Sequence, residues 1–454
     1  MSVTPEDTDT PEVYSLTRKI RKAVNRDDLQ TAEQHCLSLL KLRPRHEAAL
    51  GFLASRALAA GDAARARGYA ELGLTAAPAS PGLEFQLGCA LEAAREHEAA
   101  AAAFERALRN DPSFTVAEIC RGDQEKALGR EDAMLGTYVR ALERAQRSGQ
   151  LAQRAQLPAE VNRRISAAID VVQGARAQAV AEALEPLAAR HGVASVARMR
   201  RAADIYLGRE QYTDRHPLQR PSFLLIPDLP KQAWFEREQF PFFEKIEAQT
   251  DAIRAELLNV LADEIGMQPY VQMADDAPAA PIWRELNRSP RWSGFHLFRH
   301  GQRIEENCRR CPNTVAALES IPIMRIPEHS PESMFSVLRP KTHIPPHTGV
   351  MNGRLTVHLP LIVPHDCGRM VAGREPRPWE EGKCLVFDDS FVHEAWNDSQ
   401  HTRVVLIFDV WNPHLSEAER EAVSEGIVAI GRFNRRYGAE DPSVEQPIAA
   451  APAS

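Results

Sequence analysis

The stretch Lys341–Leu361, KTHIPPHTGVMNGRLTVHLPL, decides the fold of the second half of the chain. Its apolar run, Leu355–Val363, follows Asn and Gly and ends before Pro, which is the pattern of a short β-strand. Similar runs occur at 333–338, 384–387 and 404–410. Several short strands separated by turn residues favour a sandwich or barrel over a parallel sheet.

Two histidines lie at the edges of these expected strands. His347 closes the first part of the quoted stretch, and His393 follows 46 residues later in WEEGKCLVFDDSFVHEAWNDS, residues 379–399. Strand edges at this separation could converge across a double-stranded β-helix. Imidazole is a ligand that suits Fe(II), and a non-haem oxygenase normally adds one carboxylate.

An arginine follows in HTRVVLIFDVWNP, residues 401–413. Arg403 comes ten residues after His393, just past an expected turn at 397–400. An antiparallel return would bring its guanidinium beside the metal. There it could form a paired salt bridge with the far carboxylate of a dicarboxylate co-substrate. Two histidines and a trailing arginine are what a 2-oxoglutarate oxygenase needs.

Each of these residues also has a structural interpretation. A single histidine beside a strand, such as His343 or His358, is more often a hydrogen-bonded structural residue than a ligand. Arg403 alone is typical of a surface charge on an edge strand. The acidic pair Asp388–Asp389 is better explained as turn residues at a strand end than as metal ligands. Only the spacing of the whole set favours the chemistry.

The set resembles the aspartyl/asparaginyl β-hydroxylase family. The matching segments are WSGFHLF (292–298), ENCRRCPNT (306–314), FSVLRPKTHIPPHTG (335–349), RLTVHLPL (354–361), WEEGKCLVFDDSFVHEAWN (379–397) and RVVLIFDVWNP (403–413). Weaker similarity reaches back to about residue 223. The resemblance therefore covers nearly half of the chain.

The resemblance implies a double-stranded β-helix (jelly-roll) oxygenase that uses Fe(II), 2-oxoglutarate and O2. It assigns His347 and His393 as the iron ligands and as catalytic residues. Arg403 would bind the far carboxylate of 2-oxoglutarate, and Ser336 and His358 match positions that help to hold this co-substrate.

The chain departs from related patterns at two positions. Most oxygenases of this superfamily place an acid two residues after the first histidine, where this chain has Gly349, so water is expected to take that ligand position. Asp389 and Glu394 stay open as partners that orient a ligand imidazole. Thr356 replaces an arginine usual in the family; Arg354 matches another arginine and is assigned to the co-substrate site.

The first third of the chain has a period of 34 residues. Pro44, Pro78 and Pro112 each follow an apolar helical stretch at this spacing. It is the length of a tetratricopeptide unit, two antiparallel helices. One unit matches the pattern of small, aromatic and proline positions most clearly. Its residues are Leu87, Gly88, Ala100, Phe104, Ala107 and Pro112. The resemblance to these repeats predicts a solenoid with a concave face for a protein or peptide partner; dimerisation or bracing of the enzyme is the alternative.

These patterns predict a multidomain α + β protein. The expected divisions are a disordered N-terminus at 1–13, tetratricopeptide repeats at 14–147, a helical connector at 148–215, the oxygenase domain at 216–437 and a disordered tail at 438–454. Within the oxygenase domain we expect one opening helix over 242–261. A capping box at Ser416–Glu419 predicts a final helix that reaches about residue 436.

Composition argues against several classes of protein, namely nucleic-acid-binding, membrane-spanning and secreted proteins. The 454 residues carry a net charge of −7 without a basic block, which argues against a nucleic-acid partner. No run of about 18 apolar residues predicts a membrane span, and the polar start predicts no signal peptide. Seven scattered cysteines favour reduced thiols and a cytoplasmic protein. Cys308 and Cys311 form a CxxC pair without a second pair, so ordinary thiols are favoured over a zinc or redox site.

The sequence thus predicts a 2-oxoglutarate-dependent dioxygenase that hydroxylates an Asp/Asn-type side chain of a protein or peptide. Two alternatives stay open: hydroxylation of a lipid or small molecule on the same fold, and a repeat-based adaptor whose oxygenase domain is inactive.

Overall fold

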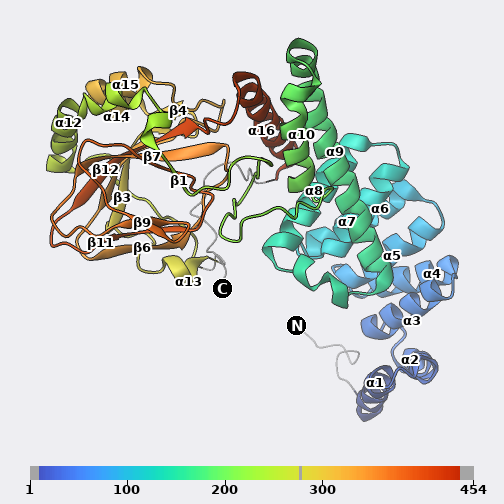
Figure 1. The fold of residues 1–454 in the computed structure, drawn as a ribbon. Coiled ribbons are helices and arrows are strands. Elements are labelled where there is room, and N and C mark those ends of the chain that lie inside the picture. Colours follow the sequence, from blue (N-terminus) through green and yellow to red (C-terminus); the bar gives the residue numbers. More distant parts are fainter. Residues whose placement is uncertain (1–9, 276–278, 440–454) are drawn as a thin grey trace. The chain divides into compact units, whose positions relative to one another are not determined.

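A computed structural model of the chain describes residues 10–275 and 279–439 (Figure 1). Its tertiary contacts divide these residues into two units, one running to Gly174 and including Arg436–Ala439, the other spanning Ala175–Arg435. The division falls inside a long helix, so the domain boundaries expected at 147/148 and 215/216 stay predictions. The expected tail lies outside the described residues from position 440 onward.

The N-terminal segment predicted to be disordered, residues 1–13, extends too far into the chain. Residues 1–9 lie outside the described residues, but Pro11–Val13 already form the first turn of helix α1 (Pro11–Val24). The side chain of Thr10 accepts a hydrogen bond from the Val13 amide, and Pro11 occupies an early helical position where it needs no amide hydrogen. Val13 is also buried, which ties this turn to the fold.

The first unit consists of paired antiparallel helices. Within the described residues the pairs are α1 with α2 (Leu29–Leu42), α3 (Glu47–Ala59) with α4 (Ala63–Leu74), α5 (Pro81–Ala93) with α6 (His97–Asn110), and α7 (Thr115–Ala127) with α8 (Glu131–Arg147). Pro44, Pro78 and Pro112 follow the second helix of the first three pairs, as expected. The predicted N-terminal helical repeats are therefore present as four helix pairs among the described residues.

Small residues let the helices of a pair approach closely. A Cβ atom added at Gly88 on α5 would lie 2.5 Å from a ring carbon of Phe104 on α6. One repeat later, Gly122 and Tyr138 have the same relation, at 2.4 Å. The glycine–aromatic pair seen in the sequence is thus the packing contact inside each hairpin, and Phe104 is fully buried there.

This contact predicts opposite effects for two glycine substitutions. Gly88→Ala forces the Phe104 ring to move and should lower the free energy of unfolding by about 1–3 kcal/mol. Gly68→Ala, on the exposed face of α4 with nothing within 4 Å, should raise it by about 0.5–1 kcal/mol. Urea denaturation followed by far-ultraviolet circular dichroism measures both. Equal effects of the two substitutions would contradict the packing role of Gly88.

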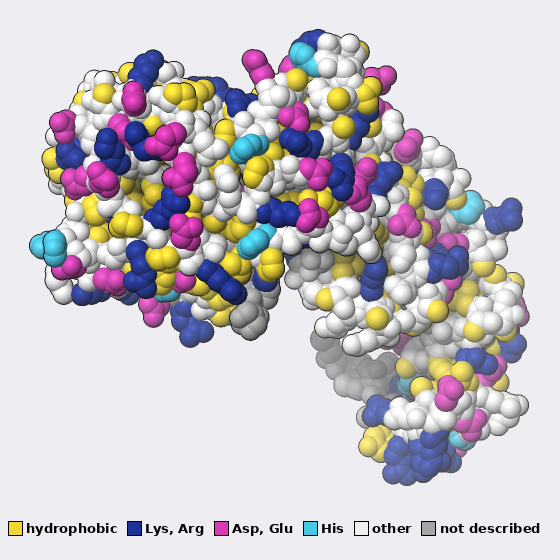
Figure 2. All heavy atoms as spheres, in the orientation of Figure 1, with side chains coloured by type: hydrophobic (Ala, Val, Ile, Leu, Met, Phe, Trp, Pro, Cys, Tyr) yellow, Lys and Arg dark blue, Asp and Glu magenta, His cyan; other side chains and the backbone are white. Residues whose placement is uncertain are grey.

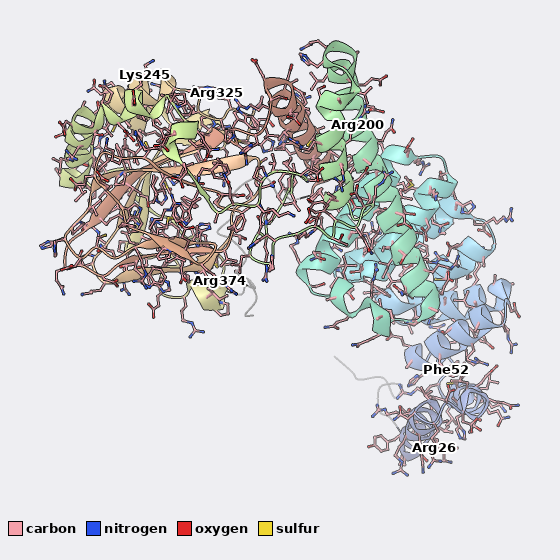
Figure 3. All side chains as sticks on the ribbon, viewed as in Figure 1. Arg26, Phe52, Arg200, Lys245, Arg325 and Arg374 are labelled. Atoms are coloured by element: carbon pink, nitrogen blue, oxygen red, sulfur yellow. The ribbon has the colours of Figure 1, made fainter. Side chains whose placement is uncertain are left out.

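The surface of the first helix pair is basic. Helix α1 carries Arg18, Lys19, Arg21 and Lys22, and Arg26 lies two residues after its end. Figure 2 shows Lys and Arg side chains gathered over this end of the first unit, and Figure 3 labels Arg26 there. Phe52 on α3, also labelled in Figure 3, is partly buried and packs inside the adjacent cluster of apolar side chains.

The second unit contains a helical layer and two antiparallel sheets. Helix α9 (Ala159–His191) crosses the division between the units. Its C-terminal part packs with α10 (Val193–Tyr206) and α16 (Glu417–Tyr437) around one apolar cluster. Ser416 and Glu419 exchange the reciprocal backbone hydrogen bonds of the predicted capping box. The predicted final helix is confirmed.

The larger sheet has eight strands. Seven follow the order β1 (Trp234–Phe235), β10 (Leu385–Phe387), β7 (Arg354–Ile362), β12 (Arg403–Trp411), β5 (Ser333–Leu338), β3 (Trp292–Arg299) and β2 (Gln268–Pro269), and β4 (Gln302–Arg303) pairs with β3. The four strands expected from the sequence are β5, β7, β10 and β12, and all four lie in this sheet. Their prediction is confirmed.

Alternation along β7 and β12 separates an apolar face from a polar one. Leu355, Val357 and their odd-numbered successors on β7 face a large apolar core, as do Val404, Leu406, Phe408 and Val410 on β12. The alternate residues of both strands face the other way, because successive side chains of a strand point to opposite faces. This face carries the candidate site.

Short helices cover the apolar face. They are α11 (Phe243–Glu247), α12 (Thr250–Asp263), α14 (Glu305–Arg310) and α15 (Pro312–Glu319) (Figure 1). The prediction of a single helix over 242–261 was wrong, because the helix is interrupted between Glu247 and Thr250. The Glu247 carbonyl accepts a hydrogen bond from the Thr250 hydroxyl at 2.6 Å. Cys308 and Cys311 lie buried in this core as free thiols.

The smaller sheet has four strands in the order β6 (Thr342–His347), β11 (His393–Asn397), β8 (Met370–Ala372) and β9 (Glu375–Arg377). An apolar cluster lies between the two sheets. Pro345 and Pro346 cannot donate backbone hydrogen bonds, which fits the position of β6 at the sheet edge. The two antiparallel sheets are established; their description as a double-stranded β-helix stays a prediction.

No helix within residues 10–275 and 279–439 combines the length and the apolar character needed to cross a bilayer.

Candidate active site

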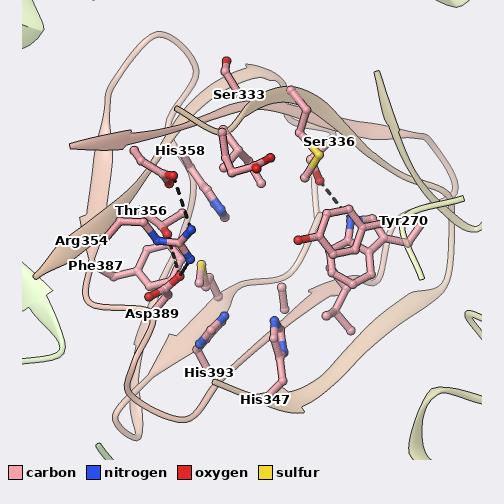
Figure 4. Close-up of a pocket in the computed structure, with 18 of the residues that line it drawn as sticks. Tyr270, Ser333, Ser336, His347, Arg354, Thr356, His358, Phe387, Asp389 and His393 are labelled. Carbon is pink, nitrogen blue, oxygen red and sulfur yellow. Dashed lines mark hydrogen bonds and ion pairs between the residues drawn. The ribbon is translucent and has the colours of Figure 1, made fainter. Parts of the chain in front are cut away.

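One pocket between the two sheets brings together the site residues predicted from the sequence. The pocket opens to solvent, and the space within its outline, open solvent included, is about 770 Å³. Its lining includes all six of them: Ser336, His347, Arg354, His358, His393 and Arg403. Figure 4 shows His347 and His393 side by side on one wall, with His358 and Ser336 on the opposite side.

The two predicted metal ligands are direct cross-strand neighbours. His347 at the end of β6 pairs in register with His393 at the start of β11, and their ring centroids lie 4.0 Å apart. Nδ1 of His347 lies 2.8 Å from the Pro345 carbonyl oxygen, and Nδ1 of His393 lies 2.8 Å from that of Phe391. A carbonyl oxygen only accepts, so each Nδ1 carries a proton, and Nε2 is the nitrogen through which the neutral ring would bind a metal.

This arrangement fits a divalent metal. Burial lowers the pKa of His393 to about 4, so the ring is neutral at physiological pH. A neutral imidazole with Nδ1 held by a carbonyl is the form that binds metals through Nε2. Among the described residues no three His, Cys, Asp or Glu side chains gather as a metal-binding group. Of the four histidines that line the pocket, His347 and His393 are the adjacent pair that a metal could bridge.

Arg403 fits the predicted carboxylate partner. Its side chain is 1% exposed, and the described residues offer its Nε and Nη1 no hydrogen-bond acceptor. It stacks over Trp379 with its guanidinium carbon 4.6 Å from the ring centroid. Burial lowers its pKa to about 10, so it remains charged at neutral pH. A buried cation without an acceptor is a strong binding site for an anion.

The route by which Arg403 reaches the pocket differs from the expectation. The sequence suggested an antiparallel return from His393, but β11 belongs to the smaller sheet and β12 to the larger one. Arg403 pairs in register with Leu338 on β5 instead. The chain changes sheets between the two residues, and both face the pocket from opposite sides.

Two further residues are arranged as hydrogen-bond donors. Trp379 Nε1 donates to Nδ1 of His358 at 3.2 Å, and burial beside the Arg403 charge lowers the pKa of His358 well below its usual range. The neutral ring therefore carries its proton on Nε2. Trp292 Nε1 donates to the Ser336 hydroxyl at 3.1 Å, which leaves the hydroxyl hydrogen to be donated elsewhere.

Arg354 is already held by carboxylates. Its Nη2 lies 2.6 Å from Asp389 Oδ2 and its Nη1 lies 3.5 Å from Asp409 Oδ2. The Thr356 hydroxyl donates to the same Asp389 oxygen at 3.1 Å. The geometry gives the co-substrate role more readily to Arg403, and the assignment of Arg354 to that role stays a prediction.

Gly349 lies against the Asp389 carboxylate. A Cβ atom added at Gly349 would lie 2.2 Å from Asp389 Cγ and 2.3 Å from both carboxylate oxygens. The Gly349 amide also donates to the Asp389 carbonyl oxygen at 2.5 Å. The space that a side chain at position 349 would need is therefore filled by Asp389, which gives a steric reason for glycine.

A double-mutant cycle tests this explanation. Gly349→Ala alone should lower the melting temperature, because the new methyl group overlaps a buried ion-paired carboxylate, at a cost of about 1–3 kcal/mol. The same substitution should cost much less in a background of Asp389→Ala. Differential scanning calorimetry of the two single variants and the double variant measures the coupling. An equal cost in both backgrounds would contradict it.

The other acidic residues considered from the sequence lie apart from the imidazole pair. Glu394 Oε2 lies 2.9 Å from His343 Nε2, on the face of the smaller sheet that points away from the pocket. Asp388 accepts from the Ser390 amide at 2.9 Å, which confirms a turn role, and its burial raises its pKa to about 7. Main-chain carbonyls therefore orient Nδ1 of His347 and of His393. The carboxylates of Asp389 and Glu394 do not take this part.

Sequence reasoning missed several pocket residues. Asp409 is the clearest case, because an acid inside the apolar strand RVVLIFDVW at a pocket-facing position was a readable signal. Glu332 and Tyr270 also line the pocket. Glu332 immediately precedes β5 and Tyr270 immediately follows β2, and no sequence signal pointed to either residue.

Similarity to known proteins covers this same region. A family model described as aspartyl/asparaginyl beta-hydroxylase matches residues 247–413. Aspartate beta-hydroxylase domain-containing protein 1 of Mus musculus is 34% identical over 259 residues, which cover 56% of this chain and 69% of that protein. The chain belongs to the aspartyl/asparaginyl β-hydroxylase family.

Two other family members match shorter parts. Ornithine lipid ester-linked acyl 2-hydroxylase of Rhizobium tropici is 36% identical over 40% of this chain and 62% of its own length. The human aspartyl/asparaginyl beta-hydroxylase is 39% identical over 32% of this chain and 19% of its own length. The chain thus spans less than two thirds of either protein.

Among solved structures, the tetratricopeptide protein TTC0263 of Thermus thermophilus covers 40% of this chain and 97% of its own at 20% identity, with a TM-score of 0.29.

Proposed function

We propose that this member of the β-hydroxylase family is an Fe(II)- and 2-oxoglutarate-dependent dioxygenase. It would convert 2-oxoglutarate and O2 to succinate and carbon dioxide while it inserts a hydroxyl group into a C–H bond of an Asp/Asn-type side chain. One observation carries the proposal: two adjacent imidazoles line the same pocket as a buried guanidinium that has no hydrogen-bond acceptor among the described residues. We also propose that the two sheets form the double-stranded β-helix of such oxygenases.

The protein's own residues bind and orient. His347 and His393 would hold the iron through Nε2, with their rings fixed by the Pro345 and Phe391 carbonyls. When bound, Fe(II) supplies the activation of O2 that 2-oxoglutarate oxidation requires. Water would take the ligand position that Gly349 leaves without a side chain.

Three residues would hold the co-substrate. Arg403 would form a paired, charge-assisted hydrogen bond with its far carboxylate, in a site where the low dielectric strengthens the interaction. The Nε2 proton of His358 and the hydroxyl of Ser336 would donate to its remaining oxygens. These donors are fixed before binding by Trp379 and Trp292, so little side-chain entropy is lost.

Turnover by the full-length protein tests the proposal. With Fe(II), ascorbate and O2, the purified chain should convert 2-oxoglutarate to succinate, which nuclear magnetic resonance detects directly. Omission of iron should remove the product. Failure to bind or convert 2-oxoglutarate in the presence of iron would contradict the proposal and favour an adaptor with an inactive domain.

Hydroxylation of a lipid acyl chain is the second candidate. The relative from Rhizobium tropici carries that activity in its name, and the pocket has apolar side chains on several walls, among them Met334, Ile344, Met370 and Ile407. For the helix pairs of the first unit we propose a protein or peptide partner, and the basic surface of α1 would suit an acidic one. The free cysteines support a reducing, cytoplasmic setting.

A further inference from the structure

The charged side chains that line the pocket include more carboxylates than guanidiniums, so the pocket does not favour a further anion. Two guanidiniums face it, from Arg354 and Arg403, together with three carboxylates, from Glu332, Asp389 and Asp409. With the lining histidines counted as neutral, the formal charges of the described side chains leave one negative charge in excess. This balance decides what kind of group can enter beside the co-substrate.

The positive charge of Arg354 is already compensated. Asp389 and Asp409 both bond its guanidinium, at 2.6 and 3.5 Å. Thr356 lies between the same two acids, because its hydroxyl donates to Asp389 and its Cα is the register partner of Asp409 on β12. A carboxylate that entered here would compete with two resident carboxylates for one cation.

The remaining cation is taken by the co-substrate in the proposed reaction. Arg403 binds the far carboxylate of 2-oxoglutarate, and the two charges of Fe(II) cancel the two charges of this diacid. The loaded pocket thus keeps its surplus of one negative formal charge. A proton on the His300 imidazole, 3.1 Å from Glu332 Oε1, would offset one negative charge at Glu332.

We propose that the pocket accepts a substrate group without negative charge, such as a carboxamide or a hydrocarbon chain, and rejects a carboxylate. The inference rests on the proposed function and narrows it: within the Asp/Asn-type class it selects Asn over Asp. An entering carboxylate would lose its hydration without gaining a cation and would face like charges, both of which are costly.

Position 356 is the specificity-determining residue in this inference. It lies on the pocket-facing side of β7 between the two acids that neutralise Arg354. A threonine there contributes a hydroxyl but no charge, whereas an arginine would add one positive charge at the point where the acids meet. The charge at this position therefore sets whether an acidic group is tolerated.

Binding of a matched pair of probes tests the proposal without turnover. The probes are hexanamide and hexanoate, each with a terminal trifluoromethyl group, observed by fluorine nuclear magnetic resonance. The full-length protein is first loaded with Zn(II) in place of iron and with 2-oxoglutarate, whose own binding is measured in the same sample. We expect hexanamide to bind at least about tenfold more tightly than hexanoate.

Variants then shift the preference by charge alone. Thr356→Arg and, as a second route, the isosteric Asp409→Asn each add one unit of positive charge and should move the hexanamide-to-hexanoate ratio towards hexanoate by about tenfold or more. Thr356→Val removes the hydroxyl without changing charge and should keep the wild-type ratio. The comparison of ratios cancels any affinity of the carboxylate for the metal, which is common to all samples.

The outcomes separate this inference from the function on which it rests. Absence of 2-oxoglutarate binding would overturn both. If 2-oxoglutarate binds but hexanoate binds as tightly as hexanamide, or neither probe enters, the inference fails and the proposed function stands. A ratio that stays the same in both charge variants would equally overturn it.

Discussion

Substitution of His347 or His393 with alanine should reduce 2-oxoglutarate turnover to the background rate. The two imidazoles are the only side-chain ligands offered at this point among the described residues, so either loss leaves a single protein ligand. We expect the affinity for Fe(II) or Zn(II) to fall by more than about 100-fold, because even the outer partners of metal ligands contribute 10–100-fold. Equilibrium dialysis with Zn(II) and a succinate assay measure the two effects.

His343→Ala is the matched control. His343 lies on the same strand β6, but it stacks on Trp396 at 4.5 Å and bonds Glu394 on the face away from the pocket. Loss of this exposed pair should cost no more than about 1 kcal/mol of stability and leave turnover intact. Turnover that survives in both His347→Ala and His393→Ala would contradict the assignment of the metal site.

Arg403→Gln should raise the KM for 2-oxoglutarate by roughly 30–1000-fold, the equivalent of about 2–5 kcal/mol for a buried charged hydrogen bond. The maximal rate at saturating 2-oxoglutarate should fall much less. Because residues 10–275 and 279–439 give Nε and Nη1 of Arg403 no acceptor, removal of this buried charge should not lower the melting temperature. Steady-state kinetics and calorimetry on the same samples test both statements.

Arg377→Gln provides the comparison for this variant. Arg377 on β9 also stacks over a tryptophan, Trp234, at 5.0 Å, but Glu236 and Glu375 satisfy it at the surface. Its KM should match that of the wild type, and Arg403→Lys should recover part of the lost affinity. A loss of stability in Arg403→Gln without a change in KM would mean a structural role for Arg403.

The hydrophobic pattern located the central strands of the larger sheet but missed the strands of the smaller one. Strands β5, β7, β10 and β12 are buried on at least one face and read as apolar runs. Strand β6 contains two prolines and two histidines, and β11 is HEAWN. Neither has the composition of a strand, since tertiary contacts hold them in place.

The spacing of His347, His393 and Arg403 was sufficient to predict that they meet. The strand connection that brings them together was not predictable. A hairpin was expected between His393 and Arg403, but the chain passes from the smaller sheet to the larger one there. Local patterns predict turns, whereas strand partners are chosen by burial of whole faces. The contact of Asp409 with Arg354 was not predictable for the same reason, although the acid itself stood out in its apolar strand.

The sequence alone determined the repeat period, the family, six of the residues that line the pocket and the departure at Thr356. These follow from local periodicity and from side-chain chemistry, which the chain carries in any conformation. Only the tertiary structure decided that Asp389 and Asp409 neutralise Arg354, while Arg403 finds no acceptor in the part of the chain that the structure describes. Such a balance depends on which charges are buried together, and residues distant in sequence become neighbours only when the sheets pack.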